Sequence, residues 1–502
     1  MIARRQRASL LALSIAMAGG TLSGCAVTPV ELSSAEMSMA ADGSLSTIAA
    51  GQEPIAGAID LYEAMARALK YNLDHQVELA EQAVRERELR LAHYSLLPSV
   101  VAGSGYAARN EILASSSRNA STGLESLATS TSQDRRLRDA DIAFGWNVLD
   151  FGLSYVRARQ AADHVLIQNE LRRKVALRLL EDVRAAFWRA VSAQRLLSKL
   201  HRVEMQAREV EREARRMARD QQTSQITALT YEREIVEIQR TIGEITRELN
   251  TAKAELGALM NVPPFAVFSV RGGSPVLPRL PRADPRELVH LAVMNRPELR
   301  EVEYRLRINE HEAHAALLEL LPGVQLIAGA NWDSNSFLLY NNWMNWGAKA
   351  SWNLLKVFSY PARRSLVEEQ EALLVTKARA VTMAIMTQVY VSRIRYAHAQ
   401  KEHGIAVKYR NVQNDLLQQI RKEASAGRVA RQTLVREELN TVVAEAKLDI
   451  AYATLQSAYA NVETSIGIDP IDGLWTADSS IRDIAAMLRS SGSSFLRTAS
   501  AE

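Results

Sequence analysis

An internal repeat constrains this chain more than any other feature of its sequence. Four dipeptides mark the two copies: Leu97-Pro98 with Trp146-Asn147, and Leu321-Pro322 with Trp352-Asn353. The interval between the two Leu-Pro marks is longer than that between the two Trp-Asn marks, so the first copy carries an insertion between its marks. Residues outside the marks keep these two offsets, because Asp60 aligns with Asp284 and Asn261 with Gly467. A match over roughly a hundred residues at one offset is typical of duplication, so we predict two copies of one unit.

Each copy has the pattern of a helix, two strands, a long helix and a returning helix. The fold class we predict is therefore mostly α, with a small antiparallel β part. The predicted boundaries are a first repeat at 59–261, with strands at about 99–109 and 139–150, and a second repeat at 284–470, with strands at about 323–333 and 343–355. The density of prolines in 262–283 predicts an extended connector. The tail, 471–502, is rich in serine and receives no role.

The predicted strands alternate with a period of two, so each has a polar and an apolar side. One side carries the polar residues Asp141, Asn147, Lys349, Ser351 and Asn353. The other side carries Trp146, Trp332 and Trp352. Such strands fit a wall with water on one side and an apolar medium on the other.

A very long helical run follows each pair of strands. No proline or glycine occurs from Arg157 to Arg219, where apolar residues from Leu179 to Leu200 alternate at spacings of four and three. This spacing is typical of coiled coils. At a rise of about 1.5 Å per residue, the run would reach roughly 90 Å. We expect each long helix to turn back, near Asp220–Ser224 in the first repeat and at Ala426-Gly427-Arg428 in the second.

The N-terminus reads as an export signal. Residues 1–24 hold three arginines followed by a short apolar run, and Leu22-Ser23-Gly24-Cys25 follows. The ending resembles the lipobox of bacterial lipoproteins, which implies that Cys25 becomes the acylated first residue of the mature chain. Residues 25–58 show no period and are predicted to form a lipidated linker. One acyl signal anchors a protein only marginally, so we expect a second membrane attachment.

The strands are the candidate for that attachment. No run of about 18 apolar residues follows Cys25, so we expect no helix that spans a membrane. A sheet in lipid must close into a barrel, and such barrels begin at about eight strands. Four strands per chain are too few, whereas three chains would supply twelve. The other possibility is that the strands are hairpins of a soluble α+β protein.

The marks, their order and their duplication resemble the TolC-like outer-membrane factors of bacterial efflux and secretion systems. The resemblance covers about residues 58–470, including the close Ile466-Gly467-Ile468-Asp469-Pro470. It implies a homotrimer whose twelve-strand β-barrel in the outer membrane continues into a twelve-helix tunnel through the periplasm, with the connector and tail forming a belt. The lipobox points to the lipoprotein branch, which is typical of drug-efflux outlets.

The predicted tunnel tip departs from the family pattern. The resemblance implies acidic residues soon after the turn glycine, but here Gly427 is followed by Arg428 and Arg431, and the first acids are Glu437 and Glu438. We therefore hypothesise a basic constriction formed by Arg428 or Arg431. The turns that would dock an adaptor contain Thr223, Ser224 and Gly427, and the first of these turns lacks a glycine.

No pattern in the chain indicates an enzyme. Phosphate-binding loops and nucleophile elbows are absent, and His311 and His314 are three residues apart where the zinc helix motif needs four. We read these histidines as solvated and expect no metal and no cofactor apart from the lipid on Cys25. The net charge of +4, with both signs interleaved along the helices, argues against nucleic acid as a partner.

Three functions stay open on the sequence. The first is a passive exit duct for small molecules, fed by an inner-membrane transporter through a periplasmic adaptor, with the protein lipid-anchored in the outer membrane. The second is the outer-membrane outlet of a type I protein secretion system. The third is a periplasmic coiled-coil adaptor or scaffold that crosses no membrane. The sequence names neither the cargo nor the particular pump and adaptor.

Overall fold

The computed structural model describes residues 29–126, 128–219, 224–264, 266–273, 277–278, 280, 284–469 and 478–498. The chain divides into two compact units, residues 1–52 and 53–502. The first contains helix α2 (Ser34–Thr47), which lies in the stretch that we predicted to be a linker. A capping box explains the helix, because Ser33 accepts from the Glu36 backbone N–H while the Glu36 carboxylate accepts from that of Ser33. The predicted signal segment and Cys25 lie outside the described residues.

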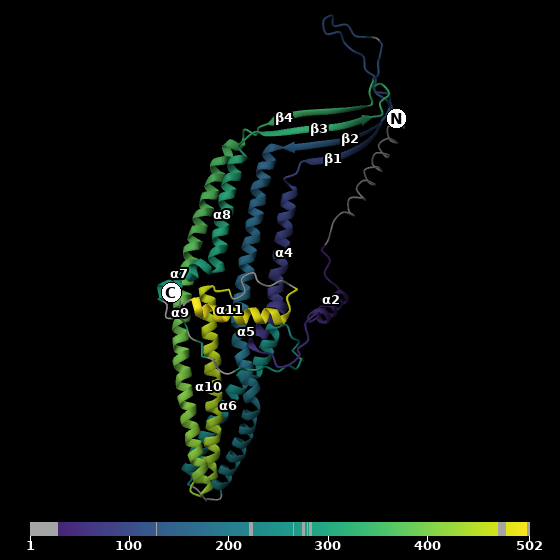
Figure 1. Cartoon of the computed structure of the whole chain (residues 1–502). Helices are drawn as coiled ribbons and strands as arrows, with labels where there is room; N and C mark the ends of the chain where they lie inside the picture. Colours follow the sequence, from purple (N-terminus) through teal and green to yellow (C-terminus); the bar gives the residue numbers. More distant parts are fainter. Residues whose placement is uncertain are drawn as a thin grey trace, which may run out of the picture. The chain divides into compact units, whose positions relative to one another are not determined.

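The second unit holds one antiparallel sheet of four strands (Figure 1). The strands are β1 (Ser99–Ala108), β2 (Arg136–Asn147), β3 (Gly323–Asp333) and β4 (Asn342–Ser351). They pair in the order β1-β2-β3-β4, so the two predicted hairpins lie side by side and β2 joins β3. This leaves β1 and β4 as the two edges of the sheet.

Two strands end earlier than predicted. β2 ends at Asn147 because the Asn147 side chain accepts from the Leu149 backbone N–H at 3.0 Å, which caps the start of α5 (Val148–Arg219). β4 ends at Ser351, and the Asn353 side chain accepts from the Leu355 N–H at 3.2 Å, just before α9 (Lys356–Ser425). The side chains of Asn147 and Asn353, which we predicted to lie in the ends of strands, therefore accept hydrogen bonds from the backbone at the starts of helices.

Two groups of helices continue from the sheet (Figure 1). Next to the sheet, α4 (Leu73–Tyr94) packs on α5, α5 on α8 (Pro297–Leu318), and α8 on α9. Farther away, α6 (Gln225–Leu259) packs on α5, α5 on α10 (Arg431–Ile466), and α10 on α9. The order of helices therefore follows the order of strands, with α4 and α6 at one edge and α9 at the other.

The helix that we predicted at the start of each repeat is broken into two. Asn72 separates α3 (Leu61–Tyr71) from α4, because its extended backbone ends α3 while its side chain accepts from the His75 backbone N–H at the start of α4. The second repeat breaks at the equivalent place, where Arg296 separates α7 (Pro285–Asn295) from α8. No glycine or proline marks the first break, which is why periodicity alone missed it.

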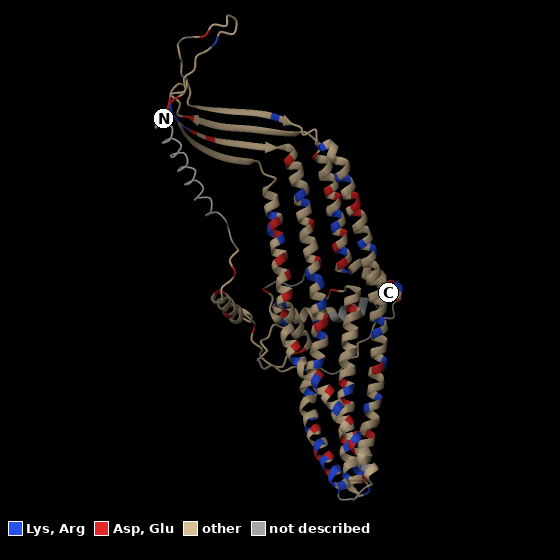
Figure 2. Cartoon of the chain, turned by 180° about the vertical axis from the view of Figure 1, so that it is seen from behind, with Lys and Arg blue, Asp and Glu red and all other residues tan. Residues whose placement is uncertain are grey.

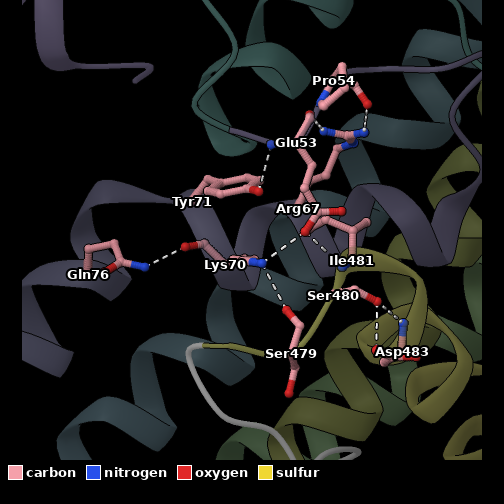
Figure 3. A network of polar contacts seen from close by, with 10 residues as sticks. All are labelled: Glu53, Pro54, Arg67, Lys70, Tyr71, Gln76, Ser479, Ser480, Ile481 and Asp483. Carbon is pink, nitrogen blue, oxygen red and sulfur yellow. Dashed lines mark hydrogen bonds and ion pairs between the residues drawn. The ribbon is translucent and has the colours of Figure 1, made fainter. Parts of the chain in front are cut away.

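The tail forms a helix, α11 (Ile481–Thr498), that packs against α3. Ile484 and Leu488 are buried in one cluster with Met65, Leu69 and Phe187. Polar contacts fix the same contact region (Figure 3): the Lys70 ammonium lies 2.9 Å from the Glu53 carboxylate and donates to the Ser479 carbonyl at 2.8 Å. The Glu53 carboxylate also accepts from the Ile481 backbone N–H, so it joins the start of the second unit to α11.

By length and composition, α9 contains a stretch apolar enough to cross a membrane, and 11% of that stretch is buried in the single chain. This finding rests on length and composition alone and does not show that α9 crosses a membrane. The helix nevertheless packs as part of the bundle, because Ile385 and Val389 lie in a buried cluster with Leu288 of α7 and Leu455 of α10.

Candidate functional site: the strand wall and the helix tip

The strands bring together a polar face, which we define as the side of the sheet that carries Asp141, Asn147 and Lys349. Cross-strand register extends it, since Asp141 lies opposite Asn331, and Gln325 lies between Asn147 on β2 and Lys349 on β4. Ser351 is opposite Gly323 on the same face. The Asn331 amide donates to the Asn345 side chain at 2.6 Å, a pair that the sequence patterns did not single out. Asn353 is not part of this face, because it lies beyond the end of β4.

The opposite face of the sheet is apolar and rich in exposed aromatic side chains. Trp332 is opposite Ala140, and Trp346 is opposite Ala328. Trp346 is 82% exposed, and every residue of β4 is exposed in the single chain. Trp146 is on this side too and packs edge-on against Phe151, with ring centroids 5.8 Å apart. Exposed apolar surface of this extent calls for an apolar neighbour.

Carboxylates gather at the loop end of the polar face. Asp139 and Asp141 on β2 belong to it, and Asp333 on β3 lies directly opposite Asp139. The carboxylate of Asp139 lies over Gly105, and that of Asp141 over Gly103, where side chains of β1 would otherwise stand. The two aspartates therefore reach across to the edge strand β1.

The loops that close the two hairpins are joined to each other. Asn335 is 7% exposed, and its side chain accepts from the Asp134 backbone N–H at 3.1 Å and donates to the Ser132 carbonyl at 3.0 Å. The Asp134 carboxylate accepts from the Ser336 N–H at 2.6 Å. These contacts join two hairpins that lie far apart in the sequence, so no local sequence signal predicts them.

The helix tip, where α5 turns into α6 and α9 into α10, carries charges of both signs (Figure 2). Arg428 is 73% exposed at the side chain and lies 3.5 Å from the Glu423 carboxylate. Arg431 is 69% exposed and lies 3.8 Å from Glu213 on α5. Both arginines thus face acids of their own chain, and a constriction built from them stays a prediction.

The predicted docking turns are described only in part. Thr223 lies outside the described residues. Ser224 precedes α6 as its N-terminal cap without a side-chain capping bond, which leaves its hydroxyl exposed. Gly427 has a φ of 71°, a left-handed conformation that glycine adopts without strain.

Side-chain contacts tie the two helix pairs together at the tip, and sequence reasoning missed them. The Tyr231 hydroxyl on α6 donates to the Gln432 carbonyl on α10 at 2.7 Å, and burial raises the pKa of Tyr231 to about 12. Arg436 lies 2.9 Å from Glu234 on α6 and also pairs with Glu437. Burial opposes the charge of Glu437, but hydrogen bonds from Gln413, Asn440 and Arg436 together keep its pKa below the usual range.

A row of ion pairs joins α5 of the first repeat to α10 of the second. Four pairs take the cation from α5 and the anion from α10 or its C-terminal end: Arg184–Glu463 at 2.9 Å, Lys199–Glu445 at 3.0 Å, Arg173–Asp469 at 3.4 Å, and Arg195 with Asp449. The pair of Arg431 with Glu213 at the tip has the opposite polarity. The shared polarity of the first four pairs favours one alignment of the two helices.

The two histidines considered for zinc differ, because His314 is exposed as predicted whereas His311 packs between two helices. His311 is 13% exposed at the side chain, so the expectation that it is solvated is wrong. Its Nε2 lies 3.6 Å from the carboxylate of Asp163 on α5, which Arg307 also contacts. The pair belongs to the packing of α8 on α5.

No family model matches the sequence, and neither does any curated protein. Solved structures do match. The outer-membrane channel OprN is 16% identical with a TM-score of 0.62, over 81% of this chain and 89% of that one. The open-state MtrE outer-membrane channel of Neisseria gonorrhoeae is also 16% identical, with a TM-score of 0.62 over 81% and 88%.

A third match, the CmeC outer-membrane channel of Campylobacter jejuni, is 11% identical with a TM-score of 0.60, over 92% of this chain and 97% of that one. All three structures are channels and not enzymes. They share the mostly helical architecture with a small antiparallel sheet that the sequence predicts. The chain therefore has the fold of the TolC-like outer-membrane factors.

Proposed function

We propose that three copies of this chain close a barrel in the outer membrane and form a passive exit duct for small molecules. The observation that carries the proposal is the sheet with two open edges, a polar face and an exposed apolar face. In lipid, unpaired backbone groups at such edges cost several kcal/mol each, so the sheet has to close. Barrels begin at about eight strands, so other copies must supply the rest.

The helices support the same assembly. Their order follows the strands, so copies that meet at β1 and β4 also meet at α4 and α9. Both of these edge helices expose apolar side chains: Leu73, Val77, Val84 and Leu91 on α4, and Leu366, Leu373 and Met383 on α9. A ring of three such units would enclose a tunnel of twelve helices that continues the barrel.

The predicted duplication is supported by the bounds of the elements. The offset from Leu97 to Leu321 carries the bounds of α3 and α4 onto those of α7 and α8. The offset from Trp146 to Trp352 carries the start of β2 onto that of β4, and the start of α6 onto that of α10. The insertion in the first copy therefore falls in its hairpin loop.

The partners in this proposal are an inner-membrane transporter and a periplasmic adaptor. The adaptor would dock at the tip turns that contain Ser224 and Gly427, and the cargo would be chosen by the transporter. A lipid on Cys25 would supplement the barrel as an anchor. The exposed arginines Arg428 and Arg431 would surround the tunnel entrance.

Planar-bilayer recording on detergent-extracted protein tests the duct directly. We expect an oligomer band in unheated samples on denaturing gels, a monomer band after heating, and stable conductance steps from the oligomer. A monomer in the soluble fraction without conductance would refute the proposal.

Protein secretion and a periplasmic scaffold are the alternatives. A scaffold would have to bury its hairpins, but all of β4 and the aromatic Trp346 are exposed in the single chain. A deletion strain separates the first two functions: lost resistance to small toxic compounds with an unchanged set of secreted proteins supports efflux, and the reverse supports secretion.

A further inference from the structure

The two hairpins of the sheet have equivalent registers. Ser99 lies opposite Gly145 in the first, and the equivalent residues, Gly323 and Ser351, lie opposite each other in the second. The register of β2 with β3 within one chain can therefore be used to predict the register between neighbouring chains. There β4 takes the place of β2, and β1 of the next copy takes the place of β3.

The transfer defines a register. Within the chain, Ala143 on β2 is opposite Gly329 on β3, and their equivalents are Lys349 on β4 and Gly105 on β1. We propose that β4 pairs with β1 of the next copy so that Lys349 lies opposite Gly105, and that Lys349 forms an ion pair with Asp139 of that copy. This inference rests on the proposed closure of the barrel by several copies.

Charge complementarity supports the pair. Lys349 is the only basic side chain on the polar face of the described strands, and it lies on the open edge β4. The structure records no ion pair or hydrogen bond for the side chains of Lys349, Asp139 or Asp141 within the described part of the chain. Each of these charges is therefore available to another copy.

Gly105 leaves room for the Lys349 side chain to reach the Asp139 carboxylate of the next copy. Gly105 has no side chain, and the Asp139 carboxylate already lies over it from β2. A strand of the next copy would pair with β1 at about 4.8 Å, which is less than the length of an extended lysine side chain. Lys349 then meets a carboxylate across a single strand, where any larger residue at 105 would stand between them.

The helices agree with the same transfer. Gln160 on α5 contacts the Ile308 carbonyl and Glu312 on α8. In the contact between chains, Leu366 on α9 takes the place of Gln160. Val84 and Glu88 on α4 of the next copy take the places of Ile308 and Glu312, so Leu366 would face these two residues. Val84 and Glu88 line a shallow depression on α4 together with Leu91. Leu366 is 56% exposed in the single chain and has the apolar character to fill it.

Cysteine cross-linking tests the register on the full-length protein in membranes. The proposed register places Gly347 opposite Ala107 of the next copy, on the same face as Lys349, while the two residues lie on opposite edges of one chain. The variant with Ala107→Cys and Gly347→Cys should give disulfide-linked dimers and trimers that reductant separates, since a bridge needs Cα atoms within about 7 Å. A Cβ added at Gly347 meets no atom within 4 Å in the single chain, so the position has room for the start of a side chain.

The control pairs Ala107→Cys with Asn345→Cys, which shifts the register by two residues and stays on the same face. The parent chain, whose only cysteine is Cys25, reports cross-links that do not involve the strands. Stronger linkage in the shifted pair, or an oligomer that neither pair links, would overturn the register and leave the duct standing. A monomer with no linkage at all would overturn both.

A charge swap tests the ion pair. Lys349→Asp should lower the temperature at which the unheated oligomer band disappears, and adding Asp139→Lys should restore most of that loss. The control combines Lys349→Asp with Glu111→Lys, which has the same net charge but places the new lysine in the hairpin loop. Equal recovery in both double variants, or no loss in Lys349→Asp, would overturn the pair even if the register holds.

Discussion

Asn261 and Gly467 occupy equivalent positions in the two copies and share a left-handed backbone, with φ of 56° and 75°. Gly467 is the C-terminal cap of α10, and Asn261 follows Met260, the C-terminal cap of the equivalent helix α6. Glycine adopts this conformation without strain, whereas asparagine tolerates it at some cost. At Gly467 space is restricted as well, because an added Cβ would lie 3.0 Å from the backbone N of Arg296.

We therefore expect Gly467→Ala to destabilise the protein by about 1–3 kcal/mol, since both the backbone angle and the contact oppose it. Asn261→Gly should change stability by less than about 1 kcal/mol. Thermal unfolding followed by circular dichroism measures both. Gly404→Ala is the matched control, because Gly404 lies within α9 with no atom near its missing Cβ, and it should be neutral or stabilising. Equal effects at 467 and 404 would contradict the argument.

The two repeats of the chain fold alike, but the sequence signals for that structure are clearer in the second repeat than in the first. Pro297 begins α8 and would have revealed a helix break, but Leu73 at the equivalent position gives no such signal. Comparing the copies position by position would have found the break at Asn72. The early end of β2 is similar, because Asn147 fits the strand pattern but its side chain caps the next helix.

Periodicity predicted the strands and the polar face because alternation is a local property. It could not predict the tip contacts, since Tyr231 and Gln432 belong to different copies and lie far apart in the sequence. The same holds for the packing of α11 against α3, because the tail lies far from α3 in the sequence. In this chain, contacts between the two repeats can be found only from the structure.

The contact between Lys70 and α11 should control access to the tail. Lys70→Ala removes the bonds to the Glu53 carboxylate and the Ser479 carbonyl, which weakens the docking of α11 by about 1 kcal/mol. Trypsin should then cut at Arg482 roughly fivefold faster. Arg85→Ala is the control, because Arg85 pairs with Glu88 on α4, and it should leave the rate unchanged. Unchanged cleavage in Lys70→Ala would show that apolar packing alone holds α11.

Glu437 should make the helix tip sensitive to acid. Its pKa is below the usual carboxyl value, so its contribution to stability is complete above that value and is lost as the pH falls through the lowered pKa. We expect the tip to loosen in acid and channel conductance to rise. Glu437→Gln should remove this part of the pH dependence, whereas Glu438→Gln, at a neighbouring exposed ion pair with Arg421, should not. Identical pH profiles for wild type and Glu437→Gln would contradict the assignment.

The exposed arginines at the tip predict ion selectivity. If Arg428 and Arg431 surround the tunnel entrance in the trimer, their charges repel cations over a distance of about 8–10 Å at moderate salt. The variant with Arg428→Ala and Arg431→Ala should therefore shift the reversal potential toward cations in a salt gradient, and the shift should shrink at high salt. Arg240→Ala is the control, since Arg240 is an exposed residue on α6 paired with Glu244 and lies away from the turn. A channel that is strongly cation-selective, and stays so when both tip arginines are removed, would show that no basic constriction exists there.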